Sequence, residues 1–177
     1  STHENPDGDG LGCAYAMHHI AKKMSIESKI ITATKFSKQY NFLNQDNCIE
    51  LYDYDIHYNW IKDADAAFIF DVGDFVRLRD VGRALIENKI YTFNIDHHPS
   101  LENSSFNENY VDTAAAATGE MIYEFIKKNE INFTKDEAIG VYTAIMTDTG
   151  SFRHSNTNSN CHKIAMECIE LGVNSSR

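Results

Sequence analysis

Apolar residues follow two spacings along the chain, and each spacing predicts one kind of secondary structure. Runs that are continuously apolar or β-branched predict three strands, at Lys29–Ala33, Ala66–Asp71 and Lys89–Asp96. Stretches with apolar residues three or four apart predict five helices, at Leu11–Met24, Phe75–Asn88, Ala115–Lys128, Asp136–Met146 and Asn158–Leu171. Weaker patterns predict a short helix at Gln39–Leu43, a polar loop over 99–110 and a short strand that ends at Val111.

The order of these elements predicts the fold class. Strands and helices alternate through the first half of the chain, which is typical of an α/β fold with a mainly parallel β-sheet flanked by helices. In such sheets, ligands bind beyond the carboxyl ends of the strands. Polar residues that directly follow the predicted strands are therefore the first candidates for a functional site.

Composition and charge disfavour several classes of protein. The 177 residues are 42% hydrophobic, enough for one packed domain, and no apolar run reaches the roughly 18–20 residues of a membrane span, so no membrane contact is expected. A net charge of −10, from 26 acidic and 16 basic residues, disfavours binding of duplex DNA through a basic surface. Four cysteines without a CxxC pair favour a reduced, cytoplasmic protein, and Cys161 and Cys168 are expected on one buried helix face.

A first polar cluster, HENPDGDGLG, lies before the first predicted helix and contains His3, Asp7 and Asp9. On an extended backbone, Asp7 and Asp9 would point to the same side, as a pair of metal ligands could. Two other interpretations stay open. One is an Asp-Gly turn in which Asp9 caps the following helix, and the other is a calcium loop, which would need a closing Glu that the sequence lacks.

Two further clusters directly follow predicted strands. Asp71 ends the apolar run AAFIFD, where a buried carboxylate is costly unless it is paired or binds a metal, whereas Asp74 is better placed as a helix cap. Asp96, His97 and His98 follow the next strand, and imidazole is a suitable ligand for Mn, Fe, Co and Zn. A buried, hydrogen-bonded histidine pair is the alternative at this position.

A fourth cluster, TDTGSFRH, follows an apolar helical stretch. It contains the carboxylate of Asp148, several hydroxyl groups, and Arg153, which could hold an anion. Taken alone, this segment is equally well interpreted as an ordinary polar loop after a helix.

Together, the four clusters favour a metal centre. Six candidate ligands lie at the ends of predicted elements: His3, Asp7, Asp9, Asp71, His97 and Asp148. So many carboxylates cannot share one pocket in the ionised state unless cations are bound there. Two divalent ions would form a dinuclear centre that activates water for phosphoryl transfer. Oxygen-rich ligands with two imidazoles favour Mn²⁺ over an all-thiolate zinc site.

The segments HENPDGDGLG, FIFDVGD, NIDHHPS and TAIMTDTGSFRHSNT resemble, in order and spacing, the motifs of the DHH phosphoesterase superfamily. The resemblance is greatest to the branch of oligoribonucleases, 3′-phosphoadenosine-5′-phosphate (pAp) phosphatases and cyclic-di-AMP phosphodiesterases. It implies the α/β DHH domain and two Mn²⁺ ions, with Mg²⁺ or Co²⁺ as substitutes. It also implies hydrolysis of phosphate esters in short single-stranded RNA or small adenine nucleotides.

The same resemblance implies a role for each site residue. Two metal sites would share Asp71 as a bridging ligand, with His3 and Asp7 on one ion and Asp9, His97 and Asp148 on the other. His98 would contact the scissile phosphate or protonate the leaving group, and Asp96 would support it. Arg153 and His154 would contact the substrate.

Members of the superfamily carry a strand before the first motif and a C-terminal domain that grips the substrate. Residues 1–177 are therefore expected to be the catalytic DHH domain of a longer protein, lacking that first strand and that substrate-binding domain. A manganese-dependent inorganic pyrophosphatase is an alternative, although the TGSFRHSNT tail weighs against it. A non-catalytic nucleotide- or metal-binding module is another, and a homodimer is left open.

Overall fold

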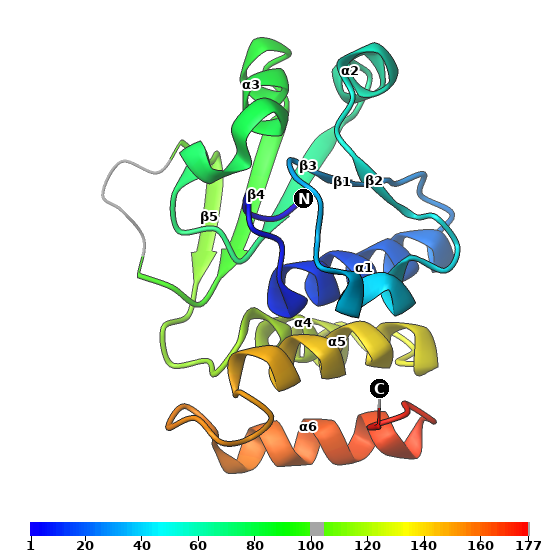
Figure 1. Cartoon of the computed structure of the whole chain (residues 1–177), viewed down its shortest axis with the longest axis vertical. Helices are drawn as coiled ribbons and strands as arrows, with labels where there is room; N and C mark the ends of the chain where they lie inside the picture. Colours follow the sequence, from blue (N-terminus) through cyan, green and yellow to red (C-terminus); the bar gives the residue numbers. More distant parts are fainter. Residues whose placement is uncertain (100–104, 177) are drawn as a thin grey trace.

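All strand pairs in the described part of the chain are parallel, and helices lie between most consecutive strands (Figure 1). The computed structural model describes residues 1–99 and 105–176. The α-helices are α1 (Gly8–Lys23), α2 (Tyr54–Lys62), α3 (Arg79–Glu87), α4 (Thr118–Lys128), α5 (Lys135–Asp148) and α6 (Ser159–Glu170). The 3₁₀ helices are η1 (Lys38–Asn44) and η2 (Phe75–Leu78), and the strands are β1 (Ile30–Thr32), β2 (Ile49–Leu51), β3 (Ala66–Phe70), β4 (Tyr91–Asp96) and β5 (Glu108–Val111).

The strands form two parallel groups. One group pairs β1 with β2, and the other has the order β3-β4-β5. Ser1 bonds to the free edge of β3, because its amino group donates to Phe68 O at 2.9 Å and its carbonyl accepts from Phe70 N at 3.0 Å. The expectation of an α/β fold with a mainly parallel sheet and flanking helices is confirmed.

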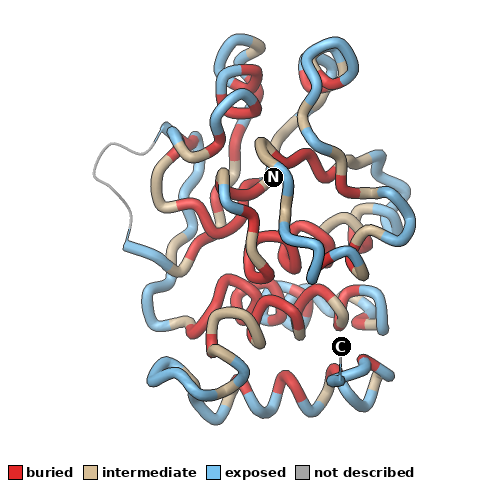
Figure 2. The backbone as a smooth tube through the Cα atoms, in the orientation of Figure 1, coloured by how far each residue is buried: buried red, intermediate tan, exposed pale blue. Residues whose placement is uncertain are grey.

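Successive side chains of β3 enter two cores on opposite faces of the sheet. Ile69 is fully buried in one core with Leu85 of α3, and Phe70 is buried in the other with Leu11 of α1 and Ile145 of α5. Each such side chain contributes about 1.5–3 kcal/mol by leaving water. The buried positions continue through the helices below the sheet, which lie in layers from α1 through α4 and α5 to α6 (Figure 2). The carboxyl end of β3 is therefore fixed from both sides.

Helices α1 and α5 cross at two glycines, Gly12 and Gly140. A Cβ atom added to Gly12 would lie 2.3 Å from the carbonyl oxygen of Gly140, and one added to Gly140 would lie 2.3 Å from the oxygen of Gly12. The two backbones therefore approach more closely than any side chain would permit. This contact holds the amino end of α1 against the carboxyl end of α5, where two candidate ligands lie.

Several element predictions are wrong in detail. Strand β2 and helix α2 were not expected, because a three-residue strand carries little pattern and the aromatic, acidic stretch of α2 has few core residues, chiefly His57 and Ile61. The helix expected at Phe75–Asn88 is divided into η2 and α3, and Arg79 at the junction has φ 52°. The loop expected over 99–110 ends earlier, because β5 begins at Glu108, and its residues 100–104 lie outside the described residues.

Two other sequence-based expectations concern the cysteines and membranes. Cys161 and Cys168 are both fully buried on α6, as predicted from their spacing. All four cysteines have free thiols. Among the described residues, no helix has the length and apolar character needed to cross a membrane.

Candidate metal centre

The first motif forms the start of α1, and this separates its two carboxylates. The helix begins at Gly8, not at Leu11, and Asp7 is its cap, because Asp7 Oδ1 accepts from Asp9 N at 3.0 Å and from Gly10 N at 3.2 Å. Asp7 has an extended backbone, but Gly8 and Asp9 are helical, so the two carboxylates do not share one extended stretch. The cap is also Asp7 rather than Asp9. Asp9 lies inside the first turn, and its carboxylate belongs to a different group of candidate ligands from that of Asp7.

The carboxylate of Asp9 is held by the amino end of α4. Thr118 N donates to Asp9 Oδ2 at 2.7 Å, and Gly119 N donates to Oδ1 at 2.9 Å. The sequence pattern predicted that this helix begins at Ala115, but it begins at Thr118. The later start makes these two amides available to Asp9. A helix amino end stabilises a negative charge. Nevertheless, complete burial raises the pKa of Asp9 well above its usual value, and the charges of Asp71 and Asp148 raise it further.

Asp71 lies where β3 ends, and its backbone has φ 61°. This left-handed conformation is uncommon for a residue with a side chain and costs on the order of 1–3 kcal/mol. It directs the carboxylate toward three imidazoles: Oδ2 lies 3.3 Å from His3 Nε2, and Oδ1 lies 3.1 Å from His98 Nδ1 and 3.7 Å from His97 Nε2. Burial raises the pKa of Asp71, but the bonds with His3 and His98 lower it to about 2.

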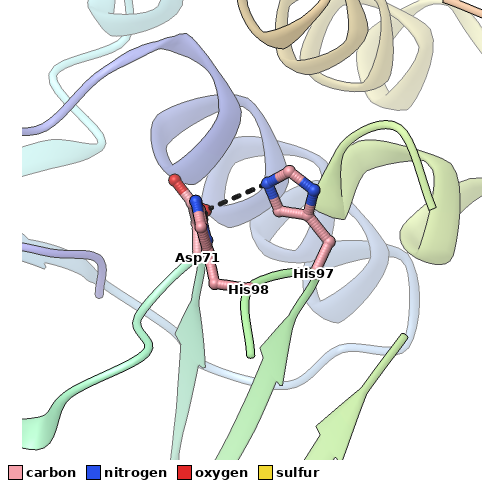
Figure 3. Close-up of side chains that lie close together, drawn as sticks. All are labelled: Asp71, His97 and His98. Atoms are coloured by element: carbon pink, nitrogen blue, oxygen red, sulfur yellow. Dashed lines mark ion pairs between the residues drawn. The ribbon is translucent and has the colours of Figure 1, made fainter. Parts of the chain in front are cut away.

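The two adjacent histidines after β4 have different surroundings (Figure 3). His97 is mostly buried and points toward Asp71, with its Nδ1 at 3.3 Å from Ala115 O. This bond to a carbonyl places the ring proton on Nδ1 and leaves the Nε2 lone pair for the centre. His98 is half exposed, and its Nδ1 lies 2.9 Å from Asp96 Oδ1.

Asp74 caps η2, as the sequence analysis preferred, by accepting from Val76 N at 3.0 Å.

The candidate ligands form two groups that meet at Asp71. In each group the nitrogen and oxygen atoms lie within 4.8 Å of one another: the first comprises His3, Asp7 and Asp71, and the second comprises Asp9, His97 and Asp148. The His97–Asp71 contact connects the groups, and a third set, Asp71, His97 and His98, overlaps both. All six ligands expected from the sequence are thus brought together.

The donor atoms fit divalent cations. His97 Nε2 lies 2.9 Å from Asp148 Oδ2 and 3.7 Å from Asp9 Oδ2, yet it is aligned for a hydrogen bond with neither. Asp71 Oδ1 is also buried without a hydrogen bond of good geometry. Buried polar atoms of native proteins usually have partners, so these two atoms point to a missing ligand. Oxygen donors with two imidazoles suit Mn²⁺ and similar ions.

The pKa values of two histidine ligands are raised by the carboxylates around them. Burial lowers the pKa of His3, but hydrogen bonds to Asp7 and Asp71 raise it to about 9. Burial also lowers the pKa of His97, while Asp148 and Asp9 raise it to about 9. Both imidazoles are therefore cationic at neutral pH in the metal-free protein. Binding of a cation would release these protons.

The predicted substrate residues Arg153 and His154 lie on the exposed loop after α5. Arg153 Nε donates to Gly150 O at 2.9 Å, and His154 Nδ1 lies 3.3 Å from Asp148 O. The structure thus places both beside the end of α5 that carries Asp148. Sequence reasoning did not identify the backbone groups of Ala115, Thr118 and Gly119 as contacts of the ligands, because main-chain contacts leave no signal in residue type.

Several curated proteins have sequences that align with nearly the whole of this chain. The bifunctional oligoribonuclease and PAP phosphatase NrnA of Thermus thermophilus is 29% identical over 175 residues, which are 98% of this chain and 49% of that protein. A probable manganese-dependent inorganic pyrophosphatase of Streptococcus equi subsp. zooepidemicus is 22% identical, over 96% of this chain and 53% of its own length. The chain thus spans about half the length of the curated relatives it matches.

A solved structure and a family model agree with these relatives. An exopolyphosphatase-related protein from Bacteroides fragilis has the same fold, with a TM-score of 0.89 at 23% identity, over 99% of this chain and 52% of that chain. The family model described as the DHH family, N-terminal domain, matches residues 1–145, which include the first three motifs. The resemblance drawn from the motifs is therefore confirmed, and the chain belongs to the DHH family.

Proposed function

We propose that the chain is the metal-binding part of a two-metal phosphoesterase, which hydrolyses phosphate esters in short oligoribonucleotides or in small adenine nucleotides such as pAp. The observation that carries this proposal is the meeting of two ligand groups at Asp71. Two divalent ions, Mn²⁺ in this proposal, would supply Lewis-acid activation of water and of the phosphate. The protein's part is to hold the ligands and position the substrate.

The ligand assignment follows the two groups. We assign His3, Asp7 and Asp71 to one ion and Asp9, His97 and Asp148, with Asp71 shared, to the other. The surroundings of His97 and Asp9 support the second assignment. Ala115 O fixes the tautomer of His97, and two amides of α4 fix the carboxylate of Asp9.

His98 is proposed to act on the substrate. Asp96 is fully buried and holds His98 Nδ1 at 2.9 Å, which leaves Nε2 of a half-exposed ring for the scissile phosphate or the leaving group. Asp96 also accepts from His98 N at 3.0 Å, so it fixes both the ring and its backbone. Arg153 and His154, exposed beside the end of α5, are proposed to contact the substrate as well.

The substrate class rests on the relatives. Two proteins named as oligoribonuclease and PAP phosphatase, from Thermus thermophilus and Streptococcus mutans, align with 98% and 95% of this chain. Because the chain spans about half of each, we propose that a second domain of the whole protein grips the substrate. We also propose that the strand expected before the first motif belongs to the whole protein and pairs with β3. Substrate positioning supplies much of the rate of such reactions.

An activity assay with several substrates tests the proposal. Short RNA, pAp, cyclic-di-AMP and pyrophosphate are supplied in parallel with Mn²⁺, and an Asp71→Ala variant is the control. Release of mononucleotide or phosphate that is lost in the variant would support the proposal and identify the substrate. Binding of two Mn²⁺ ions without turnover would indicate that the residues that bind the substrate lie outside residues 1–177. Failure to bind any Mn²⁺ would overturn the proposal.

A manganese-dependent pyrophosphatase is the second candidate, because relatives with that name align with 96% of this chain. The residues near the centre favour it less. Pyrophosphate binding calls for unpaired basic side chains, but Arg79, near the first motif, is already paired with Glu4. Turnover of pyrophosphate alone in the same assay would reverse this preference.

A further inference from the structure

The chain after α5 turns back sharply onto the end of that helix. Gly150, Ser151 and Phe152 have φ values of 54°, 60° and 62°, so three successive residues are left-handed. For residues with side chains this conformation costs roughly 1–2 kcal/mol each, and it persists only where the surrounding contacts require it. The turn returns residues 153–156 to the carbonyl groups at the end of α5, beside Asp148.

The carbonyl of Asp148 receives side-chain donors from this returning segment. As the last residue of α5, Asp148 has a carbonyl without a partner inside the helix. His154 Nδ1 lies 3.3 Å from Asp148 O, and Asn156 Nδ2 donates to the same oxygen at 3.1 Å. Asn156 Nδ2 also donates to Ala116 O at 2.9 Å. One amide group therefore connects α5 to the segment before α4.

Together with the first two residues of α4, the segment before this helix forms segment 115–119, which contacts the other two ligands of the second group. Ala115 O lies 3.3 Å from His97 Nδ1, while the amides of Thr118 and Gly119 donate to the carboxylate of Asp9. Asn156 thus connects the backbone of Asp148 to the segment that orients His97 and Asp9. Among the described residues, neither Asn156 nor segment 115–119 forms a hydrogen bond with His3 or Asp7 of the first group.

The other side of the same segment is held through Glu120. Glu120 is mostly buried, and its Oε2 accepts from Ala116 N at 2.9 Å while its Oε1 accepts from Asn160 Nδ2 at 2.5 Å. Both polar groups of the Ala116 backbone are therefore bound by side-chain networks, one through Asn156 and one through Glu120 and Asn160. Such outer contacts commonly change metal affinity by about 10- to 100-fold when they are removed.

We propose that Asn156 is a positioning residue for the second metal site, the one formed by Asp9, His97 and Asp148. It acts through the backbone, by keeping the end of α5 and segment 115–119 at the separation that these three ligands need. This inference rests on the proposed function, because it assumes that the second group binds an ion. It does not require Asn156 to touch the ion or the substrate.

Manganese binding by the Asn156→Ala variant tests the inference. Isothermal titration counts the ions and gives their affinities, and electron paramagnetic resonance reports whether two Mn²⁺ ions form a coupled pair. We expect one ion to bind as in the wild type and the other about 10- to 100-fold more weakly, with loss of the coupled signal at low Mn²⁺. Asn158→Ala is the matched control, because Asn158 caps α6 by accepting from Cys161 N at 3.0 Å, and among the described residues its side chain forms no hydrogen bond with segment 115–119.

The outcomes separate this inference from the function on which it rests. Selective weakening in Asn156→Ala, with normal binding of both ions in Asn158→Ala, supports it. Wild-type binding in Asn156→Ala, or equal weakening in both variants, overturns it and leaves the two-metal proposal intact. A wild-type protein that binds no ion overturns both. If Asn156→Ala does not fold, Asn160→Ala, which loosens the segment from its other side, must show the same selective loss.

Discussion

Substitution of Gly140 by alanine should destabilise the protein because α1 and α5 leave no room for a methyl group. The added Cβ would lie 2.3 Å from Gly12 O and 2.9 Å from Ala16 N, whereas ordinary contact begins at 3.4 Å. The helices would have to separate by about 1 Å. Overpacking of this kind costs about 1–3 kcal/mol, and the upper value applies because backbone atoms cannot rotate away.

Part of this cost is offset by the helix itself. Alanine favours a helix interior over glycine by about 1 kcal/mol, so the net loss of unfolding free energy should be about 2 kcal/mol. For a chain of this size, the midpoint of thermal unfolding should fall by roughly 4–8 °C. Mn²⁺ affinity should fall as well, because Asp9 lies on α1 and Asp148 on α5 and a separation of the helices moves them apart.

Thermal unfolding followed by circular dichroism, together with Mn²⁺ titration, measures both effects. Gly73→Ala is the control, since its added Cβ would have ordinary contacts of 3.6 Å or more and its φ is not left-handed. It should leave the midpoint unchanged or slightly higher. An unfolding midpoint for Gly140→Ala at or above that of the wild type would show that the helix crossing is not tight, and the reasoning would be wrong.

Three other predictions concern the centre itself. Asp71→Asn should weaken the binding of both ions by at least about 100-fold, because it removes the shared carboxylate; isothermal titration that finds even one ion bound with wild-type affinity would contradict the bridging role. Mn²⁺ at about 100 times its dissociation constant should stabilise the protein by about 2.7 kcal/mol, seen as a higher unfolding midpoint that EDTA reverses; no change on adding EDTA would argue against a metal site. The pKa values of His3 and His97 are raised to about 9 from an unfolded value near 6.5. Their contribution to the stability of the metal-free protein is therefore fully present below about pH 6.5 and is lost as the pH rises through 9. Unfolding midpoints without metal should therefore fall between pH 7 and 10 while Mn²⁺ affinity increases over the same range, and a metal-free midpoint that rises would refute the assigned protonation.

The element types could be predicted because the evidence for them is local. Buried strands such as β3 are continuously apolar, and Asp71 follows β3 directly, so the position of a chemically useful carboxylate could be read from adjacent residues. Boundaries were less accurate. The start of α4 is at Thr118 rather than at Ala115. The alanines before it fit a helix equally well by type, but contacts with His97, Asn156 and Glu120 hold them in another conformation.

The sequence by itself determined which side chains are candidate ligands and that they lie at strand and helix ends. It did not determine, from residue spacing, how Asp7 and Asp9 divide between two ligand groups; only the motif resemblance separated them. The tertiary structure decides that division, because α1 begins between them and the amino end of α4, more than 100 residues away in the chain, binds Asp9. Such long-range contacts depend on how helices pack, as at Gly12 and Gly140 where the backbones of α1 and α5 meet, and no local pattern encodes that packing.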